Sequence, residues 1–387
     1  MSKIRHVEVH QVAYQAKDFG NDGNPVFKPG SSIDLTSFVI VIMTDEGVRG
    51  EYAAVWAGDK MTLAQTLNFA PRLVGRDPHR REELALEFIQ KHRKQDKMGY
   101  GPIDICLWDL AGKEFGTPIY RMLGGYRTEL PAYASTLFGD RNGGLSSPDD
   151  YADYAEYCLG LGYVGFKVHT WTTCKVREEC RNLRTIAARV GGKMAIMLDC
   201  SSQLRTFAQA IEVGRVCDEI GAMWYEDPFL PSSESRVAHR KLRQLIKTPL
   251  LITEHVRGLQ AKADFVIADA TDFLRADPEY DVGITGVMKT AHLAEALGID
   301  VELHGCGPAH RHCIAAIPNT NFYELILAHP KVGNHLVQPV YAEGYRDEID
   351  AISPNGTFSV PEGPGLGVTY DWDWINAHRI ALHVFAE

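Results

Sequence analysis

The chain lacks three features that would place it outside the cytoplasm. It has eight cysteines among 387 residues but no C-x-x-C pair, so we expect free thiols in a reducing setting. Residues 1–10 are charged and carry no apolar stretch of the signal-peptide kind. No apolar run reaches the length of a membrane span, which excludes a transmembrane helix. We therefore expect a cytoplasmic protein without membrane contacts.

The chain also has fewer basic than acidic residues. Lysine and arginine number 40 against 50 acidic residues, and the net charge of −10 argues against general binding to nucleic acid or anionic membranes. It does not exclude an anionic substrate, because a bound metal ion can reverse the local field. Hydrophobic residues make up 45% and charged residues 23%, as in ordinary globular proteins. The length exceeds that of a usual single domain, so two domains are expected.

The first part of the chain, residues 1–128, is predicted to be an α+β domain. Residues 7–14, 37–44 and 48–52 alternate or form short apolar runs, which are typical of strands. Residues 61–125 have apolar positions at helical spacing and stop at a Gly-Gly pair. Strands followed by helices indicate the α+β class.

From residue 130 onward, short apolar runs alternate with amphipathic stretches. The runs are 130–135, 165–169, 195–199, 223–227, 250–254, 273–277, 301–304 and 322–326. The stretches that separate most of them are 149–161, 177–190, 207–220, 237–247, 259–268 and 285–297. This repeated βα unit predicts a TIM-like barrel over residues 129–355, with a brief last helix. We expect the Pro/Gly-rich tail, 356–387, to return to the first domain.

The active site of a TIM barrel lies at the C-terminal ends of its strands. Seven consecutive predicted strands, from the second to the eighth, end in or carry ionisable residues. They are Lys167 and His169, Asp199, Glu226, Glu254, Asp277, His304 and Glu324. One such residue is usually a solvated loop residue or a helix N-cap, but seven in phase with the strand repeat favour a functional site.

Three of these residues predict a metal site. Asp199, Glu226 and Glu254 follow adjacent strands, so their carboxylates should converge, repel one another and need a cation. All-oxygen ligands suit a hard ion, and we expect one Mg²⁺ per subunit. Helix capping or salt bridging by each residue is the alternative interpretation.

The remaining residues suggest proton transfer. Lys167 and His169 lie two apart on one strand and therefore share a face, which is the inner face at a barrel strand end. Asp277 would fix the tautomer of His304 and raise its basicity. Glu324, crowded by other carboxylates, could stay protonated and donate to an oxyanion. Together they point to removal of a proton next to a carboxylate, with the enediolate stabilised by the metal. Each residue also has a structural interpretation. Lys167 could be a surface lysine and His169 a packed core histidine. Asp277 and His304 could be a buried hydrogen-bonded pair, and Glu324 an ordinary strand residue.

A second cluster of potential ligands lies close to the seventh strand. It comprises His304, Cys306, His310, His312 and Cys313. Their spacing matches no standard structural zinc site, and all five lie in one short segment. We therefore expect no zinc there.

The whole pattern resembles the mandelate racemase subgroup of the enolase superfamily. The resemblance rests on GPIDICLWDLAGKEFGTPIYRMLGG (101–125), DVGITGVMKTAHLAEALGI (281–299), AAIPNTNFYE (315–324) and GPGLG (363–367), besides the strand-end series. It implies a capping domain, formed by the N-terminal part and the tail, over a modified TIM barrel, (β/α)7β, of the α/β class.

The resemblance also implies roles for the residues already named. Mg²⁺ would be bound by Asp199, Glu226 and Glu254. The Asp277–His304 dyad would be the acid/base, and Glu324 would hydrogen-bond the substrate carboxylate or the enediolate. Substrate choice would lie in two capping loops, Asp18–Gly30 and Ala53–Asp59, and a homo-oligomer is expected.

Three positions depart from the common pattern of the family. The K-x-K pair of many relatives is Lys167-Val168-His169 here, the usual Asn after the first metal ligand is Ser201, and the frequent Gly before Glu254 is Thr253. The histidine leaves the second base of a racemase open.

We favour dehydration of a sugar acid to a 2-keto-3-deoxy acid, because one base is enough and the first capping loop is polar. That polar lining is formed by Asp18, Asn21, Asp22 and Asn24. The alternatives are a racemase or epimerase of a hydroxy acid or amino-acid derivative, a cycloisomerase, and a non-catalytic paralogue.

Overall fold

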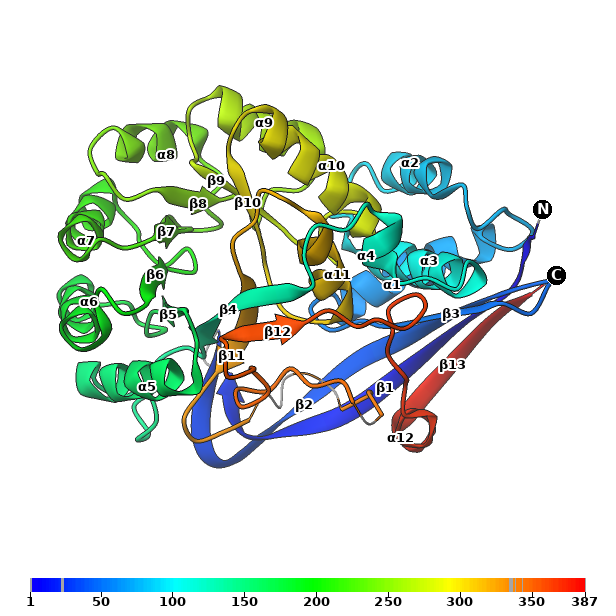
Figure 1. The fold of residues 1–387 in the computed structure, drawn as a ribbon, viewed down its shortest axis with the longest axis horizontal. Helices are drawn as coiled ribbons and strands as arrows, with labels where there is room; N and C mark the ends of the chain where they lie inside the picture. Colours follow the sequence, from blue (N-terminus) through cyan, green and yellow to red (C-terminus); the bar gives the residue numbers. More distant parts are fainter. Residues whose placement is uncertain (1, 22–23, 334–336, 338, 343, 387) are drawn as a thin grey trace.

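The capping sheet unites the two ends of the chain. The computed structural model describes residues 2–21, 24–333, 337, 339–342 and 344–386. Strands β1 (Ile4–Asn21), β2 (Pro25–Thr44), β3 (Arg49–Ala53) and β13 (Arg379–Ala386) form an antiparallel sheet in the order β13-β1-β2-β3. Helices α1 (Lys60–Phe69), α2 (Arg81–Lys91), α3 (Gly101–Glu114) and α4 (Ile119–Met122) follow β3 (Figure 1). The predicted α+β cap is confirmed.

The barrel has the predicted (β/α)7β order. Its strands are β4 (Glu129–Thr136), β5 (Gly165–His169), β6 (Ala195–Asp199), β7 (Trp224–Glu226), β8 (Leu250–Ile252), β9 (Phe273–Ala276), β10 (Asp300–Leu303) and β11 (Tyr323–Ala328). The helices between them are α5 (Pro148–Leu161), α6 (Val176–Val190), α7 (Phe207–Ile220), α8 (Arg236–Arg243), α9 (Leu259–Ile267), α10 (Gly283–Ala296) and α11 (Pro308–Ala316). Neighbouring strands are hydrogen-bonded in the order β10-β9-β8-β7-β6-β5-β4-β11. Helix α11 is brief, as expected.

The barrel strands form because both of their faces can be buried. Every residue of β5, β7 and β8 is buried, as is typical of parallel strands covered by helices on one side and by a filled interior on the other. At the closing seam, the backbone N–H of Gly305 after β10 donates to Glu324 of β11 at 2.7 Å. All eight cysteines lie in the described ranges, and each is free. Among the described residues, no helix is long and apolar enough to cross a membrane.

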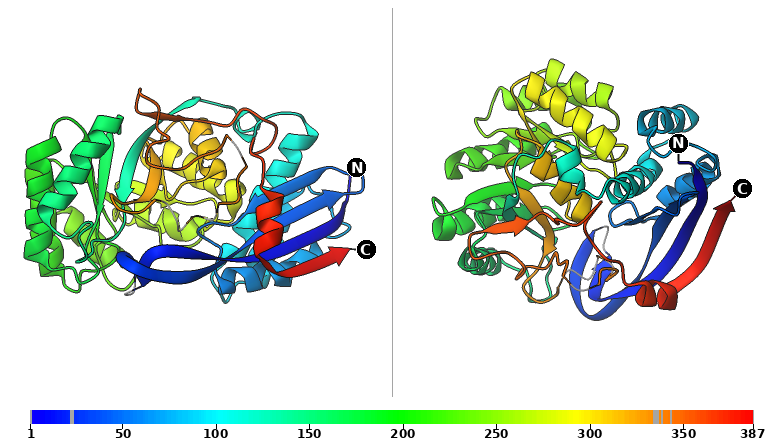
Figure 2. Two further views of the ribbon diagram at one scale, coloured as in Figure 1. Left: turned by 90° about the horizontal axis from the view of Figure 1, so that it is seen from below. Right: turned by 45° about the vertical axis from the view of Figure 1, so that its right-hand side comes forward.

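The first predicted capping loop, Asp18–Gly30, is instead the end of a long hairpin. Strands β1 and β2 pair through most of this segment, and Asp18 accepts a hydrogen bond from the Gly30 N–H at 2.8 Å. Asp22 lies outside the described residues. The hairpin end reaches the barrel, where Asn142 donates to the Phe27 carbonyl at 2.6 Å (Figure 2). The cap therefore contacts the barrel directly beside β4.

The tail returns to the capping domain, as expected, and it also contacts the barrel. Strand β12 (Thr357–Ser359) pairs with β4 of the barrel, and the backbone N–H of Leu366 then donates to Asp109 of α3 at 2.8 Å. Helix α12 (Trp372–His378) leads into β13, which pairs with β1. The domain limits at 128/129 and 355/356 stay predictions.

His312 of α11 joins the barrel to α4 and to the tail. Its Nδ1 accepts from the Tyr120 N–H at 3.3 Å, which leaves Nε2 to donate to the Leu366 carbonyl at 3.0 Å. Both ring nitrogens are therefore used in packing, and burial lowers the pKa of His312 to about 4. The cluster that contains His312 is not among the groups of described residues that could hold a metal.

The neutral state of His312 predicts a loss of stability in acid. An unfolded histidine titrates near about 6.5, so the unfolded chain binds more protons than the folded one below that pH. This contribution is complete above about pH 6.5 and is lost as the pH falls toward 4, by up to about 3 kcal/mol. We expect His312→Gln to reduce the difference in melting temperature between pH 7 and pH 5. An unchanged difference would contradict the prediction, and exposed His292→Gln is the control.

Candidate active site

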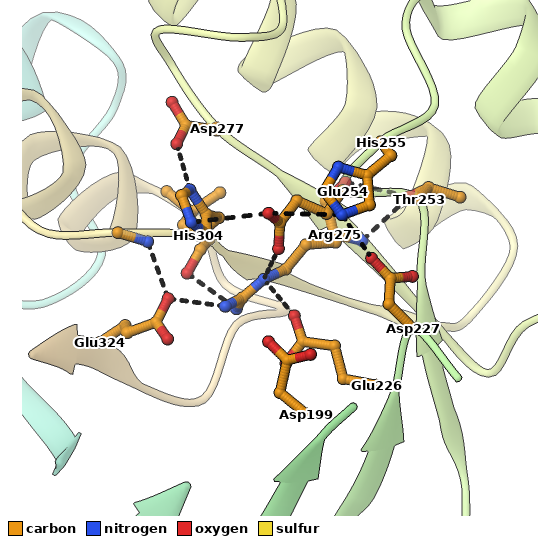
Figure 3. Close-up of polar contacts among 12 residues, drawn as sticks. Asp199, Glu226, Asp227, Thr253, Glu254, His255, Arg275, Asp277, His304 and Glu324 are labelled. Carbon is orange, nitrogen blue, oxygen red and sulfur yellow. Dashed lines mark hydrogen bonds and ion pairs between the residues drawn. The ribbon is translucent and has the colours of Figure 1, made fainter. Parts of the chain in front are cut away.

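Three carboxylates meet at the C-terminal ends of neighbouring barrel strands. Asp199 and Glu226 are the last residues of β6 and β7, and Glu254 follows β8 by two residues. One oxygen of each lies within 4.8 Å of the others, and Figure 3 shows Asp199 and Glu226 side by side. Buried like charges at this separation need a cation, so the three residues could hold a metal ion.

Two buried basic side chains, Lys167 and Arg275, contact these carboxylates. Lys167 Nζ is 2.9 Å from Glu226, 2.7 Å from Glu324 and 3.5 Å from Asp199. Arg275 of β9 places Nε 2.8 Å from Glu226 and Nη2 2.6 Å from Glu324. Both side chains are fully buried. We call these two residues the cationic floor. Lys167 is thus brought to the predicted site, but below its surface.

The cationic floor does not neutralise every carboxylate above it. Burial raises the pKa of Glu226 above its usual range, although Arg275 and Lys167 act in the opposite direction. Burial also opposes ionisation of Asp199, but His169 and Lys167 outweigh it and hold the pKa of Asp199 well below its usual range. Asp199 and Glu254 add a smaller contribution to the rise in the pKa of Glu226. A divalent ion held between the three carboxylates would favour their ionised forms.

The expectation that Glu324 stays protonated is wrong. Its Oε2 accepts from Arg275 Nη2 at 2.6 Å and from the Gly305 N–H at 2.7 Å, and its Oε1 forms an ion pair with Lys167 Nζ at 2.7 Å. Burial opposes ionisation, but Arg275 and Lys167 lower the pKa of Glu324 far below its usual range. The crowding by other carboxylates that we expected is outweighed by the cationic floor. Glu324 is therefore an ionised acceptor that pairs with both cations of the floor.

Arg275 is the residue that sequence reasoning missed. The signal was present: arginine interrupts the apolar strand FLRA, two positions before Asp277 and so on the same face. Its backbone N–H and carbonyl are held by the Oγ1 of Thr253, which accepts at 3.1 Å and donates at 3.0 Å. Thr253 has φ 96°, a conformation that favours glycine, so these bonds offset strain at the residue before Glu254.

The predicted dyad is formed. His304 Nδ1 lies 2.6 Å from Asp277, and its Nε2 points toward Glu254 at 3.7 Å (Figure 3). Asp277 also accepts from the Glu279 N–H at 2.6 Å, which fixes its orientation. Burial disfavours the imidazolium, but Glu254 and Asp277 outweigh burial and raise the pKa of His304 to about 9. Tyr280 stacks on the ring at 5.2 Å. His304 is thus an oriented, strongly basic group beside the carboxylates.

His169 meets the three carboxylates at Asp199, whereas His304 meets them at Glu254. The Nδ1 of His169 lies 2.6 Å from the Thr136 carbonyl, which can only accept, so Nδ1 carries a proton. Nε2 is left toward the site, 3.0 Å from Asp199. Ser201, where relatives commonly have Asn, donates its backbone N–H to the same carboxylate at 2.6 Å. The histidine and the serine together orient Asp199.

A second group of possible ligands adjoins the trio and was not predicted. Asp227, Glu254 and His255 also bring ligand atoms within 4.8 Å of one another. Asp227 is buried, and its carboxylate lies 3.5 Å from His255 Nε2. Burial and the nearby Glu254 and Glu226 raise the pKa of Asp227 far above its usual range. Asp227 therefore resists ionisation unless positive charge is brought close to it.

The second capping segment, Ala53–Asp59, is fastened to the barrel next to the dyad. Glu279 is fully buried and accepts from the Val55 N–H at 2.8 Å, from the Ala57 N–H and from the Tyr52 hydroxyl. Trp56 Nε1 donates to the Cys306 carbonyl at 3.2 Å. The segment is thus held at fixed positions over the strand ends.

The strand ends and both capping segments enclose one cavity of about 530 Å³. From the barrel it is lined by Asp199, Glu254, His169 and His304, and from the cap by residues that include Asn24, Trp56 and Asp59. Lys167, Glu226, Asp277 and Glu324 do not line it and lie behind these groups. The site is therefore a partly open pocket between the cap and the barrel, with acidic and histidine side chains at its base.

The chain belongs to the mandelate racemase / muconate lactonizing enzyme family of the enolase superfamily. The sequence model of that family's N-terminal domain matches residues 22–124, and the enolase C-terminal domain-like model matches residues 150–374. The second match alone covers more than half of the chain. The family identified from the sequence motifs is therefore confirmed.

Relatives of known activity include dehydratases, a racemase and a cycloisomerase. The chain is 27% identical to the N-succinyl-L-Arg/Lys racemase of Bacillus cereus, over 72% of this chain and 75% of that one. It is 26% identical to the D-gluconate/D-galactonate dehydratase of Picrophilus torridus, over 69% and 68%. The solved D-glucarate dehydratase of Agrobacterium tumefaciens, complexed with magnesium, superposes with a TM-score of 0.87 at 27% identity, covering 98% of this chain and 99% of that one.

Proposed function

We propose that this protein is a Mg²⁺-dependent lyase that dehydrates a sugar acid to a 2-keto-3-deoxy acid. The observation that carries the proposal is the position of His304 Nε2, which is 3.7 Å from Glu254. His304 lines the same cavity as Asp199 and Glu254, two members of the proposed metal trio Asp199, Glu226 and Glu254. A base held there meets the α-proton of a substrate whose carboxylate is bound at the trio. Relatives that dehydrate sugar acids support the proposal.

Asp199, Glu226 and Glu254 would hold the metal. When bound, Mg²⁺ would offset the charge of these carboxylates and of the substrate carboxylate, and so favour the enediolate. His304 takes the α-proton, and the C–H electron pair enters the enediolate. The imidazolium then returns a proton to the β-hydroxyl, which leaves as water when the C–O bond breaks. The enol product tautomerises to the 2-keto acid.

His169 favours one alternative. Its Nε2 lies at Asp199 and that of His304 at Glu254, and both residues line the cavity, so the two histidines could serve opposite faces of the α-carbon as a racemase requires. In that case the α-proton would exchange with deuterated water without loss of hydroxide. The racemase among the relatives is consistent with this second candidate.

Incubation with Mg²⁺ and a library of aldonates and aldarates tests the proposal. We expect a 2-keto acid from at least one member and no product after chelation. Deuterium exchange with recovery of an isomerised acid would favour the racemase. The absence of both elimination and exchange throughout the library would argue for a non-catalytic paralogue.

Metal binding can be tested without turnover. We expect calorimetry to show one Mg²⁺ per chain, and Asp199→Asn to weaken it by about 10-fold to 100-fold or more, because a neutral amide is a poorer ligand for a hard cation. Glu302→Gln is the matched control, since Glu302 is a buried barrel acid outside the trio. Equal affinities of the two variants would contradict the assignment of Asp199.

A further inference from the structure

The base of the cavity, formed by Asp199, Glu254, His169 and His304, is charged. The rest of its lining, which we call the upper wall and which includes Asn24, Thr36, Asp59 and Ser232, carries no cation among the described residues. Among the described residues that line it, there is no lysine and no arginine. The positive groups of the site are concentrated below. Lys167 and Arg275 are fully buried and already paired with carboxylates, so neither can reach a group in the upper cavity.

The histidines of the lining are also committed to acids. His169 lies 3.0 Å from Asp199, and His304 lies 2.6 Å from Asp277. His255 is the most exposed of them, but it is 3.5 Å from Asp227 and 3.9 Å from Glu254. Any positive charge on these rings is thus already opposed by carboxylates.

The upper wall adds a negative charge rather than a positive one. Asp59 caps α1, where it accepts from the Met61 N–H at 2.7 Å and from the Thr62 hydroxyl at 2.6 Å. Around it the wall offers neutral polar side chains, among them Asn24, Thr36 and Ser232. Hydroxyl and amide groups of this kind can bind the hydroxyls of a polyol, but they cannot neutralise a second carboxylate.

We propose that the site selects an aldonate, a sugar acid with one carboxylate and a neutral polyol chain, over the corresponding aldarate. This inference rests on the proposed function, because it assumes that the first carboxylate lies at the metal trio. The second carboxylate of an aldarate would be desolvated without a cation and would lie near Asp59. A buried charge without a partner is strongly disfavoured, whereas the terminal hydroxyl of an aldonate is not.

Matched acids of the same stereochemistry test the inference. The Mg²⁺-loaded protein is given gluconate and glucarate, then galactonate and galactarate, with binding measured by calorimetry and turnover by 2-keto acid release. We expect one aldonate to bind at least about tenfold more tightly than its aldarate. Tighter or equal binding of the aldarate, or binding of neither, would overturn the inference. Aldonate binding without any 2-keto acid would instead count against dehydration alone.

Adding a cation to the upper wall gives a second measurement. Asn24→Lys should raise the aldarate-to-aldonate ratio of kcat/KM, or of affinity, by about fivefold, as expected for a partly exposed ion pair. Asn24→Gln changes the length without the charge and should leave that ratio unchanged. An aldarate preference in the unmodified protein, or a ratio that Asn24→Gln raises equally, would show that charge in the upper cavity does not set the choice.

Discussion

Replacing His304 with asparagine should lower kcat by about 100-fold to 10,000-fold, the usual range for removal of a general acid/base. The side chain is oriented by Asp277 at 2.6 Å and is the basic group that faces the cavity beside Glu254. Asparagine cannot take the α-proton, but it preserves much of the packing. Mg²⁺ binding, measured by calorimetry, should persist, because the three carboxylates are untouched.

Two further variants make this result specific. Asp277→Asn should reduce kcat within the same range, because the carboxylate that holds the tautomer and supports the imidazolium is lost. Replacing His292, an exposed histidine of α10, with asparagine should leave kcat unchanged. A His304→Asn protein with more than a tenth of the original kcat would assign the base elsewhere, and His169 would be the next residue to replace.

Arg275→Met should lower the free energy of unfolding by about 3–5 kcal/mol, the typical cost of removing one partner from a buried ion pair. Methionine fills much of the volume, so the loss is chiefly electrostatic. It leaves Glu226 without the Nε contact at 2.8 Å and Glu324 without the Nη2 contact at 2.6 Å. The Leu303 carbonyl loses its donor as well.

Denaturant or thermal unfolding measures this effect, with two controls. Arg275→Lys keeps the charge but reaches fewer acceptors, so it should recover only part of the stability. Arg184 forms an exposed pair with Glu219, and Arg184→Met should cost about 1 kcal/mol or less. If Arg275→Met were as mild as the surface variant, the contacts of Arg275 with Glu226 and Glu324 would not be what stabilises this part of the barrel.

Much of the barrel was predictable because its strands are short, apolar and regularly spaced. Each predicted strand from 165–169 to 322–326 corresponds to an observed one within two residues, and β5 and β6 match at both ends. The metal trio and the dyad were found for the same reason: in a parallel barrel, the residue that ends a strand has a known place. Position in the strand was enough to bring Asp199, Glu226 and Glu254 together.

What was missed depends on contacts between distant strands. The charge state of Glu324 is set by Lys167 and Arg275, which belong to β5 and β9, and no local pattern reports that meeting. The hairpin at Asp18–Gly30 was missed because its polar residues indicate a loop, while pairing between β1 and β2 continues through much of it. Tertiary pairing overrode local preference in both places.

The strand order of the capping sheet also determines when that sheet can be completed during synthesis on the ribosome. Strand β1 is among the first segments made, yet one of its edges is paired by β13, the last strand of the described chain. A nascent chain can therefore complete all eight barrel strands while its capping sheet still has an open edge. This edge of β1 stays unpaired until Arg379–Ala386 has been made, so the capping sheet that begins the chain is completed after the barrel.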